Sequence, residues 1–325
     1  MSNIDIHLIL PELREAAEGA FIKNVYQYGD IFVLKLYRPG GGTTNLLIHP
    51  GRRVHLTEYA RKAPRQPPHF CTVLRKYLRE KRVLSIKQHD LDRIIIIEIG
   101  SEDETYKLVA EMFGTGNMLL LDPKNMIFVA MRYKRMRDRN IIPKAQYLFP
   151  PQRGEDLFSI DDDSFEQLLV DSNANIVRTL ASRLNLDSLS CEEICALSTV
   201  SSKVMVPEID SQTLSDLKSG FAEFTNKLKT GVSQPNLVLN DEPSEDEDTS
   251  DYVAFLPFQF QLYNELPSEN FDTFSKAIDE FFGVSDSELE DEELQSALTK
   301  EQKRLQRIID KQGEGIGNLK AKADK

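Results

Sequence analysis

Cysteine is scarce in this sequence of 325 residues, and long hydrophobic runs are absent. The three cysteines, Cys71, Cys191 and Cys195, form an odd set, and no N-terminal stretch combines a basic head, an apolar segment and a small-residue cleavage site. Because exported proteins carry disulfide frameworks and secretion signals, we expect a cytoplasmic protein. No apolar run approaches the roughly 20 residues of a membrane-spanning helix, so we expect no role in a membrane.

Motifs for nucleophilic and metal-dependent catalysis are also missing. There is no Gly-x-Ser-x-Gly, Walker loop or His-Glu-x-x-His, and no cysteine lies near a plausible base histidine. Cys191 and Cys195 lie one helical turn apart without a further ligand at suitable spacing, which favours burial over zinc binding. His49, His55 and His69 are interpreted as polar surface in a basic stretch. We therefore expect no catalytic residue, metal or cofactor.

Charges of opposite sign are segregated along the chain. The net charge at pH 7 is -12, but residues 1–150 carry 24 Lys and Arg against 16 Asp and Glu, whereas residues 151–325 carry 16 against 36. Residues 50–87 hold eleven Lys and Arg and only two acids, Glu58 and Glu80. This density favours a surface that binds a polyanion, because an ordinary solvated surface would show interspersed acids.

The first half of the chain has the spacing of strands after one initial helix. Residues 5–18 form an amphipathic pattern, with Asp5 placed to cap the first turn and Pro11 limiting its regularity. From residue 20 to residue 132, short apolar or alternating runs are separated by turn sequences such as "YGD", "RPGGGT" and "DPKN". This pattern predicts mostly antiparallel strands folded into a sandwich or barrel.

One helix is expected to interrupt these strands after Pro68. Its apolar residues, from Phe70 to Leu78, recur three and four positions apart, as on one buried face of a helix. Arg75, Arg79 and Arg82 form a separate stripe, which we expect to remain free on the surface.

The second half changes to helical periodicity and then to charged sequence. Residues 160–230 predict short helices with Ser, Asp or Asn at their starts, and the leucines between 184 and 189 indicate a helix-turn-helix connection. Residues 240–251 are acidic and of low complexity, which is typical of a disordered tether. The charged terminal segment has the composition of a long solvent-exposed helix or coiled coil. We expect the chain to be the N-terminal part of a longer protein.

These patterns predict an α+β protein with five segments. They are a β-rich domain over 1–155, a helical module over 156–235, an acidic linker or loop over 236–252, a strand and helix over 253–284 that pack on the preceding domains, and the start of a coiled-coil helix over 285–325.

Two sequences carry alternatives that the pattern alone leaves open. Asp92-Arg93 directly precedes four isoleucines, and the pair is equally suited to a polar strand entry or to reading nucleic acid, because arginine offers a planar fork and aspartate an acceptor. "GTGN", Gly114 to Asn117, is a weak phosphate-binding signal, and its spacing favours a tight turn between two strands.

Four separated motifs resemble one known family. "NIDIHLILPEL", "FCTVLRKYLREKRVLSIKQHDLDRIIIIEIG", "YKLVAEMFGTGNMLLLD" and "YLFPP" are similar, in this order, to the amino-terminal region of the NFACT family of ribosome-associated quality-control factors. The resemblance covers most of residues 1–230. It implies a core like that of the formamidopyrimidine-DNA glycosylases, a β-sandwich or barrel with helices, followed by a helix-hairpin-helix module.

The resemblance also implies a non-enzymatic function in translation. Such a protein binds obstructed large ribosomal subunits that carry peptidyl-tRNA, contacts rRNA, and recruits aminoacyl-tRNA for untemplated C-terminal tailing. A ubiquitin ligase or another quality-control factor is a further expected partner. The tRNA-binding positions would be Asp5, Asp92, Arg93, Gly114, Gly116 and Asn117. The basic residues predicted to contact the RNA backbone are Arg52, Arg53, Arg75, Arg79, Arg82, Arg132, Arg135 and Arg137.

Two other functions compete with this one. A DNA glycosylase or lyase shares the implied fold, but its chemistry needs an amino-terminal proline and an adjacent glutamate, whereas Pro11-Glu12 lie inside the chain and a zinc-finger cysteine set is missing. An adhesin is the second alternative, because some bacterial relatives carry fibronectin-binding labels. The absence of a secretion signal argues against it.

Overall fold

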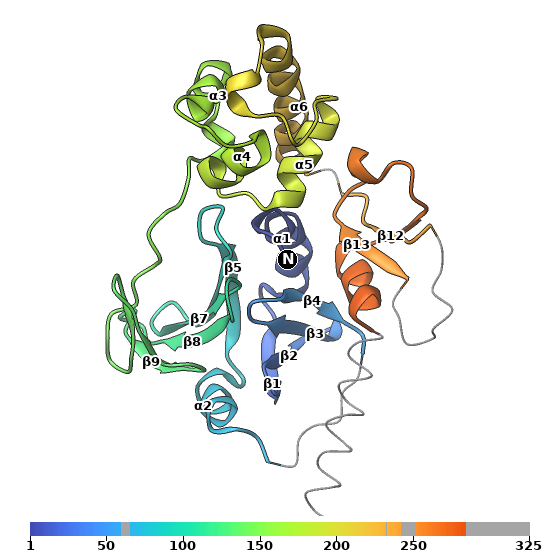
Figure 1. Cartoon of the computed structure of the whole chain (residues 1–325). Helices are drawn as coiled ribbons and strands as arrows, with labels where there is room; N and C mark the ends of the chain where they lie inside the picture. The colour runs from blue at the N-terminus through green and yellow to red at the C-terminus, as the bar shows by residue number, and fades with distance from the viewer. Residues whose placement is uncertain (60–65, 232, 242–250, 284–325) are drawn as a thin grey trace, which may run out of the picture.

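A nine-stranded antiparallel sheet dominates the first half of the chain in this computed structural model, which describes residues 1–59, 66–231, 233–241 and 251–283 (Figure 1). The strand order is β4-β3-β2-β1-β5-β6-β7-β8-β9. The strands are β1 (Phe21–Tyr28), β2 (Ile31–Arg38), β3 (Gly42–His49), β4 (Arg53–Thr57), β5 (Arg82–Gln88), β6 (Ile94–Gly100), β7 (Thr105–Glu111), β8 (Asn117–Leu121) and β9 (Ile127–Ala130). The expected mixed α+β class with a large antiparallel sheet is confirmed.

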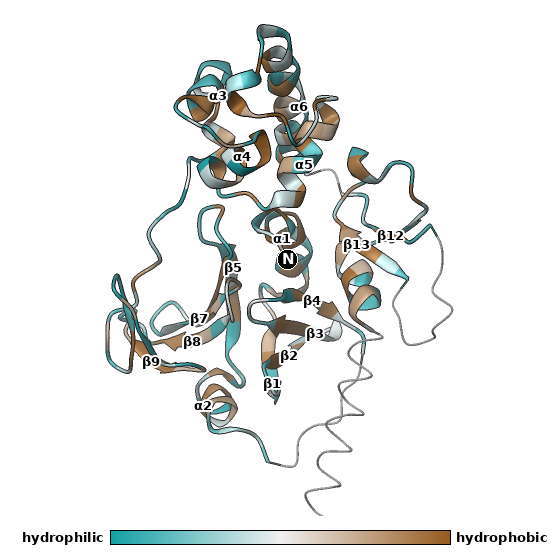
Figure 2. Ribbon diagram, viewed as in Figure 1, coloured by the Kyte–Doolittle hydropathy of each residue, from teal (hydrophilic) through white to brown (hydrophobic). Residues whose placement is uncertain are grey.

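The sheet consists of two halves that flank helix α1 (Asn3–Ala17) (Figure 1). Strands β1 and β5 meet at a single register position, Phe21 opposite Arg82. The inner side chains of α1, such as Ile9 and Leu13, are fully buried among apolar residues from both halves. Figure 2 shows hydrophobic residues along the strands and on the side of α1 that faces them. Helix α1 therefore fills the space that the two diverging halves leave between them.

The isoleucine strand β6 is covered on both faces. Ile95 and Ile97 point into the core that contains α1, while Ile94 belongs to a second cluster with Val109 and Tyr147. Successive side chains of a strand point to opposite faces, so a continuous run of isoleucines requires apolar cover on each. The second face is covered by Met136 and Ile141, from the hairpin of β10 (Lys134–Arg135) and β11 (Asn140–Ile141), and by the segment that follows.

Helix α2 (His69–Leu78) is shorter than the arginine stripe predicted from its sequence. It ends at Leu78 because Arg79 adopts an extended conformation, and Arg82 already begins β5. The Arg75 Nε donates a hydrogen bond of 2.6 Å to the carbonyl oxygen of Val25. The three arginines therefore do not form a free helical stripe, and only Arg79 and Arg82 are exposed.

A compact helical module follows, with its own core. Each of its four helices begins at an Asp or Asn whose side chain accepts a backbone N–H of the first turn, which stabilises a helix start. Ile4 and Leu8 of α1 complete this core, so α1 joins the sheet to the module. The elements are η1 (Leu157–Ser159), α3 (Asp162–Leu169), α4 (Ile176–Leu184), α5 (Ser188–Leu197), η2 (Val206–Glu208) and α6 (Ser211–Thr230).

The segment predicted as an acidic linker begins with a strand. Strand β12 (Asn236–Leu239) lies between β13 (Tyr252–Leu256) and β14 (Ser268–Asn270) in a small antiparallel sheet, with η3 (Gln261–Tyr263) between the last two. Its residues Leu237 and Val238 are buried, so apolar packing overrides the acidic context. Residues 242–250 of the linker and the predicted coiled coil from 285 lie outside the described residues.

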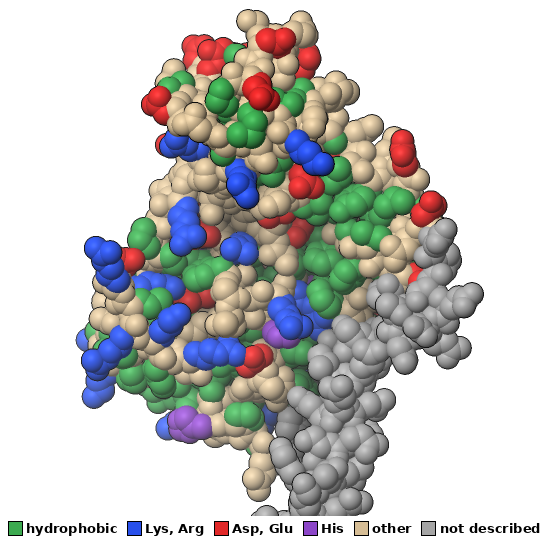
Figure 3. Space-filling model, in the orientation of Figure 1, with side chains coloured by type: hydrophobic (Ala, Val, Ile, Leu, Met, Phe, Trp, Pro, Cys, Tyr) green, Lys and Arg blue, Asp and Glu red, His purple; other side chains and the backbone are tan. Residues whose placement is uncertain are grey.

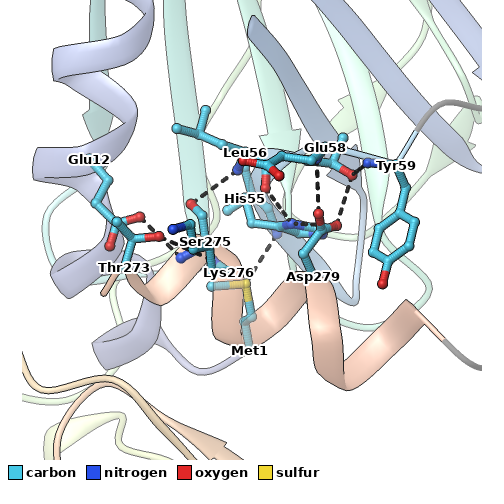
Figure 4. Close-up of polar contacts among 12 residues, drawn as sticks. Met1, Glu12, His55, Leu56, Glu58, Tyr59, Thr273, Ser275, Lys276 and Asp279 are labelled. Atoms are coloured by element: carbon cyan, nitrogen blue, oxygen red, sulfur yellow. Dashed lines mark hydrogen bonds and ion pairs between the residues drawn. The ribbon is translucent and has the colours of Figure 1, made fainter. Parts of the chain in front are cut away.

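Helical residues 274–283 pack against α1 and the edge strand β4 through polar contacts (Figure 4). The Glu12 carboxylate accepts hydrogen bonds from the backbone N–H groups of Phe274 and Ser275, at 2.6 and 3.0 Å. Asp279 accepts the Thr57 hydroxyl at 2.7 Å and lies 3.5 Å from His55. His55 is fully buried there, so its interpretation as polar surface was wrong.

Candidate nucleic-acid interface

Asn3, in the first turn of α1, connects three distant parts of the chain. Its side-chain amide donates hydrogen bonds to the carbonyl oxygens of Leu91, at 3.0 Å, and Asn185, at 3.2 Å. Leu91 belongs to the turn between β5 and β6, and Asn185 to the turn between α4 and α5. Gln88 donates to the carbonyl oxygens of both Asn3 and Asp92, each at 2.9 Å. These bonds fix the β5–β6 turn against the helical module.

Asp5 lies beside this junction and stabilises the start of α1. Its carboxylate accepts the backbone N–H of Ser2 at 2.7 Å, while the Ser2 hydroxyl accepts the backbone N–H of Asp5 at 3.1 Å. Ser2 is therefore the N-cap, and Asp5 completes a capping box from the third helical position. Burial raises the pKa of Asp5 to about 6, and the charged amine of Met1 opposes that shift.

Asp92 and Arg93 have separate environments. The Asp92 carboxylate accepts the backbone N–H of Arg93 at 2.7 Å, and the backbone N–H of Asp92 donates to the carbonyl oxygen of His89 at 2.9 Å. The Arg93 backbone is held by the residue that follows β7, since its carbonyl oxygen accepts the N–H of Met112 at 2.8 Å. The Arg93 side chain is exposed and has no ion-pair partner within the described part of the chain. A rigid backbone thus presents a free guanidinium.

The "GTGN" sequence forms the tight turn between β7 and β8 that its spacing favoured. Gly116 has φ +67, and a Cβ atom there would lie 2.1 Å from the backbone of Pro50. Its neighbour across this contact is Gly51, in the β3–β4 turn. Asn117 is buried, and its side chain bonds the backbone N–H and carbonyl of Arg132 at 3.0 and 2.9 Å. The turn therefore joins the two halves of the sheet. Of the three residues predicted here to bind tRNA, Gly114, Gly116 and Asn117, only Gly114 has open space around it.

The predicted Arg132 is engaged at the same turn. Its guanidinium donates to the carbonyl oxygens of Thr115, at 3.2 Å, and Gly116, at 3.0 Å, and pairs with the carboxylate of Asp30. Asp30 belongs to the β1–β2 turn. Three hairpin tips thus meet around Arg132. Its guanidinium is occupied by hydrogen bonds and an ion pair to these turns, so it is less available to RNA than an exposed arginine.

The remaining predicted arginines divide into exposed and buried residues. Arg52, Arg135 and Arg137 are exposed. The prediction that Arg53 lies on the basic surface was wrong. Arg53 is only 1% exposed, and its guanidinium lies 4.1 Å from the ring centroid of Phe282. Figure 3 shows Lys and Arg side chains spread over the sheet domain, with Asp and Glu gathered on the outer end of the helical module.

The predicted basic residues do not form one continuous site. Helix α2 lies at the end of the sheet away from the helical module (Figure 1). Arg82 begins β5, and the turn that carries Arg93 follows the other end of that strand, so a strand length of roughly 20 Å separates them. The exposed Arg93 therefore lies apart from the exposed Arg79 and Arg82.

An aromatic pair beside Arg93 was missed in the sequence. His89 and Phe149 stack with their ring centroids 3.7 Å apart and their planes 18° apart. Phe149 lies in the "YLFPP" motif, and no spacing rule connects that motif to the β5–β6 turn. Arg139, which follows the predicted Arg135 and Arg137, is buried here and pairs with Glu111.

Within the described ranges, no group of three or more His, Cys, Asp or Glu side chains is arranged to hold a metal ion. None of the helices described combines the length and hydrophobicity needed to cross a membrane. The arrangement offers hydrogen-bond donors, cations and an aromatic surface, which are means of binding.

Comparison with known proteins assigns the chain to a family. The archaeal Rqc2 homolog aRqcH of Methanocaldococcus jannaschii is 29% identical over all of this chain and 48% of its own length. The ribosome quality control complex subunit NEMF of Homo sapiens is 26% identical over 94% of this chain and 30% of its own length. The chain thus spans half or less of these relatives.

Solved structures share the fold at low identity. The fibrinogen binding protein from Staphylococcus aureus has a TM-score of 0.70 and 20% identity, covering 86% of this chain and 98% of that one. The N-terminal part of the fibronectin/fibrinogen-binding protein from Streptococcus suis has a TM-score of 0.64 at the same identity, covering 87% and 99%. The family model for NFACT N-terminal and middle domains matches residues 2–325, and this chain therefore belongs to the NFACT family.

Proposed function

We propose that this chain is the RNA-binding part of a ribosome quality-control factor and acts by binding rather than by catalysis. The observation that carries the proposal is the free guanidinium of Arg93 on a fixed backbone, at the junction of α1, the β5–β6 turn and the α4–α5 turn. The names of the family members, which include ribosome quality control subunits, support the class of function.

The physical argument rests on rigidity and charge. β6 is buried on both faces, so the position of Arg93 at its edge is set before any partner binds. Because the backbone is already fixed, only the side chain of Arg93 has to be ordered on binding, and its planar fork suits a phosphate or a guanine edge. The acidic helical module repels phosphate at its outer end, which favours approach of RNA along the sheet domain.

The finer proposal concerns the assembly in which this binding occurs. We propose that the whole protein binds a large ribosomal subunit that carries peptidyl-tRNA, through rRNA and tRNA contacts, and brings aminoacyl-tRNA for untemplated tailing in the cytoplasm. The ribosome would form the peptide bond, and the protein would contribute positioning. The α4–α5 pair would serve as the helix-hairpin-helix of a glycosylase-like fold, and a ubiquitin ligase would be a further partner.

A glycosylase or lyase function receives no support from the described residues. Pro11 lies within α1, and the Glu12 carboxylate is occupied in capping helical residues 274–283. Purified protein should therefore leave damaged duplex DNA intact. Strand cleavage that disappears in Glu12→Gln would overturn the binding proposal.

The experiment that tests the proposal is crosslinking of the full-length protein to RNA in cells, followed by sequencing of the attached RNA. We expect recovery of tRNA and large-subunit rRNA, and a lower recovery of tRNA with Arg93→Ala. Lys229→Ala is a matched control, because Lys229 is an exposed cation on the helical module. Recovery of messenger RNA alone, or equal recovery with all three proteins, would contradict the proposal.

A further inference from the structure

The stacked rings of His89 and Phe149 form an aromatic surface on the turn that carries Arg93. His89 begins the turn that carries Arg93, and its backbone N–H donates to the carbonyl oxygen of Ile94 at 2.9 Å. Phe149 remains 39% exposed, and the His89 side chain 28% exposed. Large aromatic side chains usually bury their faces, so a stacked pair that retains this exposure is available to a ligand.

The core holds this surface rigidly. Tyr147 contacts Phe149 edge to face, with ring centroids 5.1 Å apart. Tyr147 is itself buried, and its hydroxyl donates a hydrogen bond of 3.0 Å to the Glu111 carboxylate, which also pairs with Arg139. Glu111 ends β7, next to the strand that begins after Arg93. The aromatic pair and the backbone of Arg93 are therefore both anchored where β6 begins and β7 ends.

The cations around the pair point to a polyanionic ligand. Arg93 is exposed on the hairpin that carries His89, and Arg137 at the tip of the β10–β11 hairpin, whereas Lys87 pairs with Glu98 at 3.2 Å. Arg139 closes that hairpin and donates to the carbonyl oxygen of Leu148 at 3.4 Å, so the tip adjoins Phe149. The Asp90 carboxylate lies 3.6 Å from His89 Nε2, so Arg93 and Arg137 are the exposed cations that remain for a phosphate. An aromatic face on such a turn suits a nucleotide, whose base stacks while its phosphate is neutralised.

We infer that the His89–Phe149 pair is a stacking platform for an unpaired nucleobase of RNA, with Arg93 contacting the flanking phosphate. This inference rests on the proposed function and names the part of the RNA that the site takes. An unpaired base in a loop offers a free face, whereas a base within a duplex is already stacked on both sides. The platform therefore selects looped or single-stranded RNA over duplex RNA, without selecting a base sequence.

Fluorescence tests the platform directly, because the sequence contains no tryptophan. Phe149→Trp introduces a single indole into the 325-residue chain, and a nucleobase stacked on it quenches its emission. The matched control is Phe128→Trp, since Phe128 is 40% exposed and packs on Tyr77 of α2. We expect a stem-loop RNA to quench the first variant and not the second, and a fully paired duplex of equal length to quench neither.

Equal quenching of both variants, or of Phe149→Trp by loop and duplex alike, would overturn the platform. A parallel measurement uses Phe149→Leu, which keeps apolar volume and removes the aromatic face. We expect its affinity for the stem-loop RNA to fall roughly fivefold or more, as for loss of one base stack, with duplex affinity unchanged and the protein still fully folded at the assay temperature.

Arg93→Ala separates this inference from the proposed function. If Arg93→Ala weakens RNA binding while Phe149→Leu and the quenching assay show no effect, the platform is wrong and the proposed function stands. If neither variant changes RNA affinity, the proposed site itself is wrong. Quenching of Phe149→Trp by a protein partner and by no RNA would also overturn the platform.

Discussion

The carboxylate of Asp92 accepts a hydrogen bond of 2.7 Å from the backbone N–H of Arg93, and within the described residues it forms no ion pair with the Arg93 guanidinium. The two neighbours therefore do different things. Asp92 stabilises the β5–β6 turn, while Arg93 extends into solvent. This separation makes their contributions to folding and binding measurable one at a time.

We expect Asp92→Ala to lower the free energy of unfolding by about 1 kcal/mol, because it leaves a turn N–H without its acceptor. Arg93→Ala should change the free energy of unfolding by less than about 0.5 kcal/mol, since its side chain makes no described contact. Urea denaturation of the two single variants provides the comparison. An equal loss in both would show that the pair acts as a structural unit.

Two glycines of one turn should differ sharply in their tolerance of alanine. Gly114 and Gly116 both have positive φ, at +58 and +67, so either substitution costs about 1 kcal/mol of backbone strain. Only at Gly116 does the added Cβ collide with the backbone of Pro50 and Gly51. Gly116→Ala should therefore lose several kcal/mol more than Gly114→Ala in thermal or urea unfolding. Similar losses would argue against contact between the two turns.

Asp5 should make stability depend on pH in the acidic range. Burial raises its pKa to about 6, so the folded chain holds this proton more tightly than the unfolded chain does. The contribution of Asp5 is fully present below about pH 4 and is lost as the pH rises through about 6.

The Asp5→Asn variant, which cannot ionise, tests this dependence. Between about pH 4 and pH 7 the wild type should lose stability relative to Asp5→Asn, by at most about 3 kcal/mol. Melting temperatures across this range measure the difference. Parallel curves for the two proteins would mean that Asp5 ionises normally in the capping box.

Arg79 and Arg82 should contribute affinity without selectivity. Both are exposed near α2, away from the Arg93 junction, so their replacement by alanine should weaken all RNAs alike. Each lost phosphate contact should reduce the slope of log affinity against log salt by about 0.7 to 0.9. Lys229→Ala serves as the control. An unchanged slope in the double variant would show that this end of the sheet does not touch RNA.

Local features of the fold were predictable because they depend on neighbouring residues. Four consecutive isoleucines require a strand with two covered faces, and "GTGN" between alternating runs requires a turn. The starts of the helices in the module were predictable for the same reason, since a capping side chain acts within its own first turn. The antiparallel sheet followed from the strand and turn spacing.

Contacts between distant segments were not predictable from the pattern. The sequence placed Arg53 on a basic surface, but in the structure Phe282 of helical residues 274–283 lies over its guanidinium. The helical periodicity placed Arg75 in an exposed stripe, but its guanidinium donates a hydrogen bond to the carbonyl oxygen of Val25. The His89–Phe149 stack depends on the path of the chain after β11. The hydrophobic periodicity of the sequence does not predict that path. The candidate site therefore emerged from residues that the sequence separates widely.

Binding of tRNA by Arg93→Ala tests the central claim most directly, with Arg79→Ala as a matched exposed arginine at the other end of the sheet. We predict that Arg93→Ala loses roughly 1 to 3 kcal/mol of affinity for the preferred tRNA, retains its nonspecific RNA binding, and melts at the wild-type temperature. Arg79→Ala should weaken every RNA by the same small factor. Wild-type tRNA selectivity in Arg93→Ala would contradict the account.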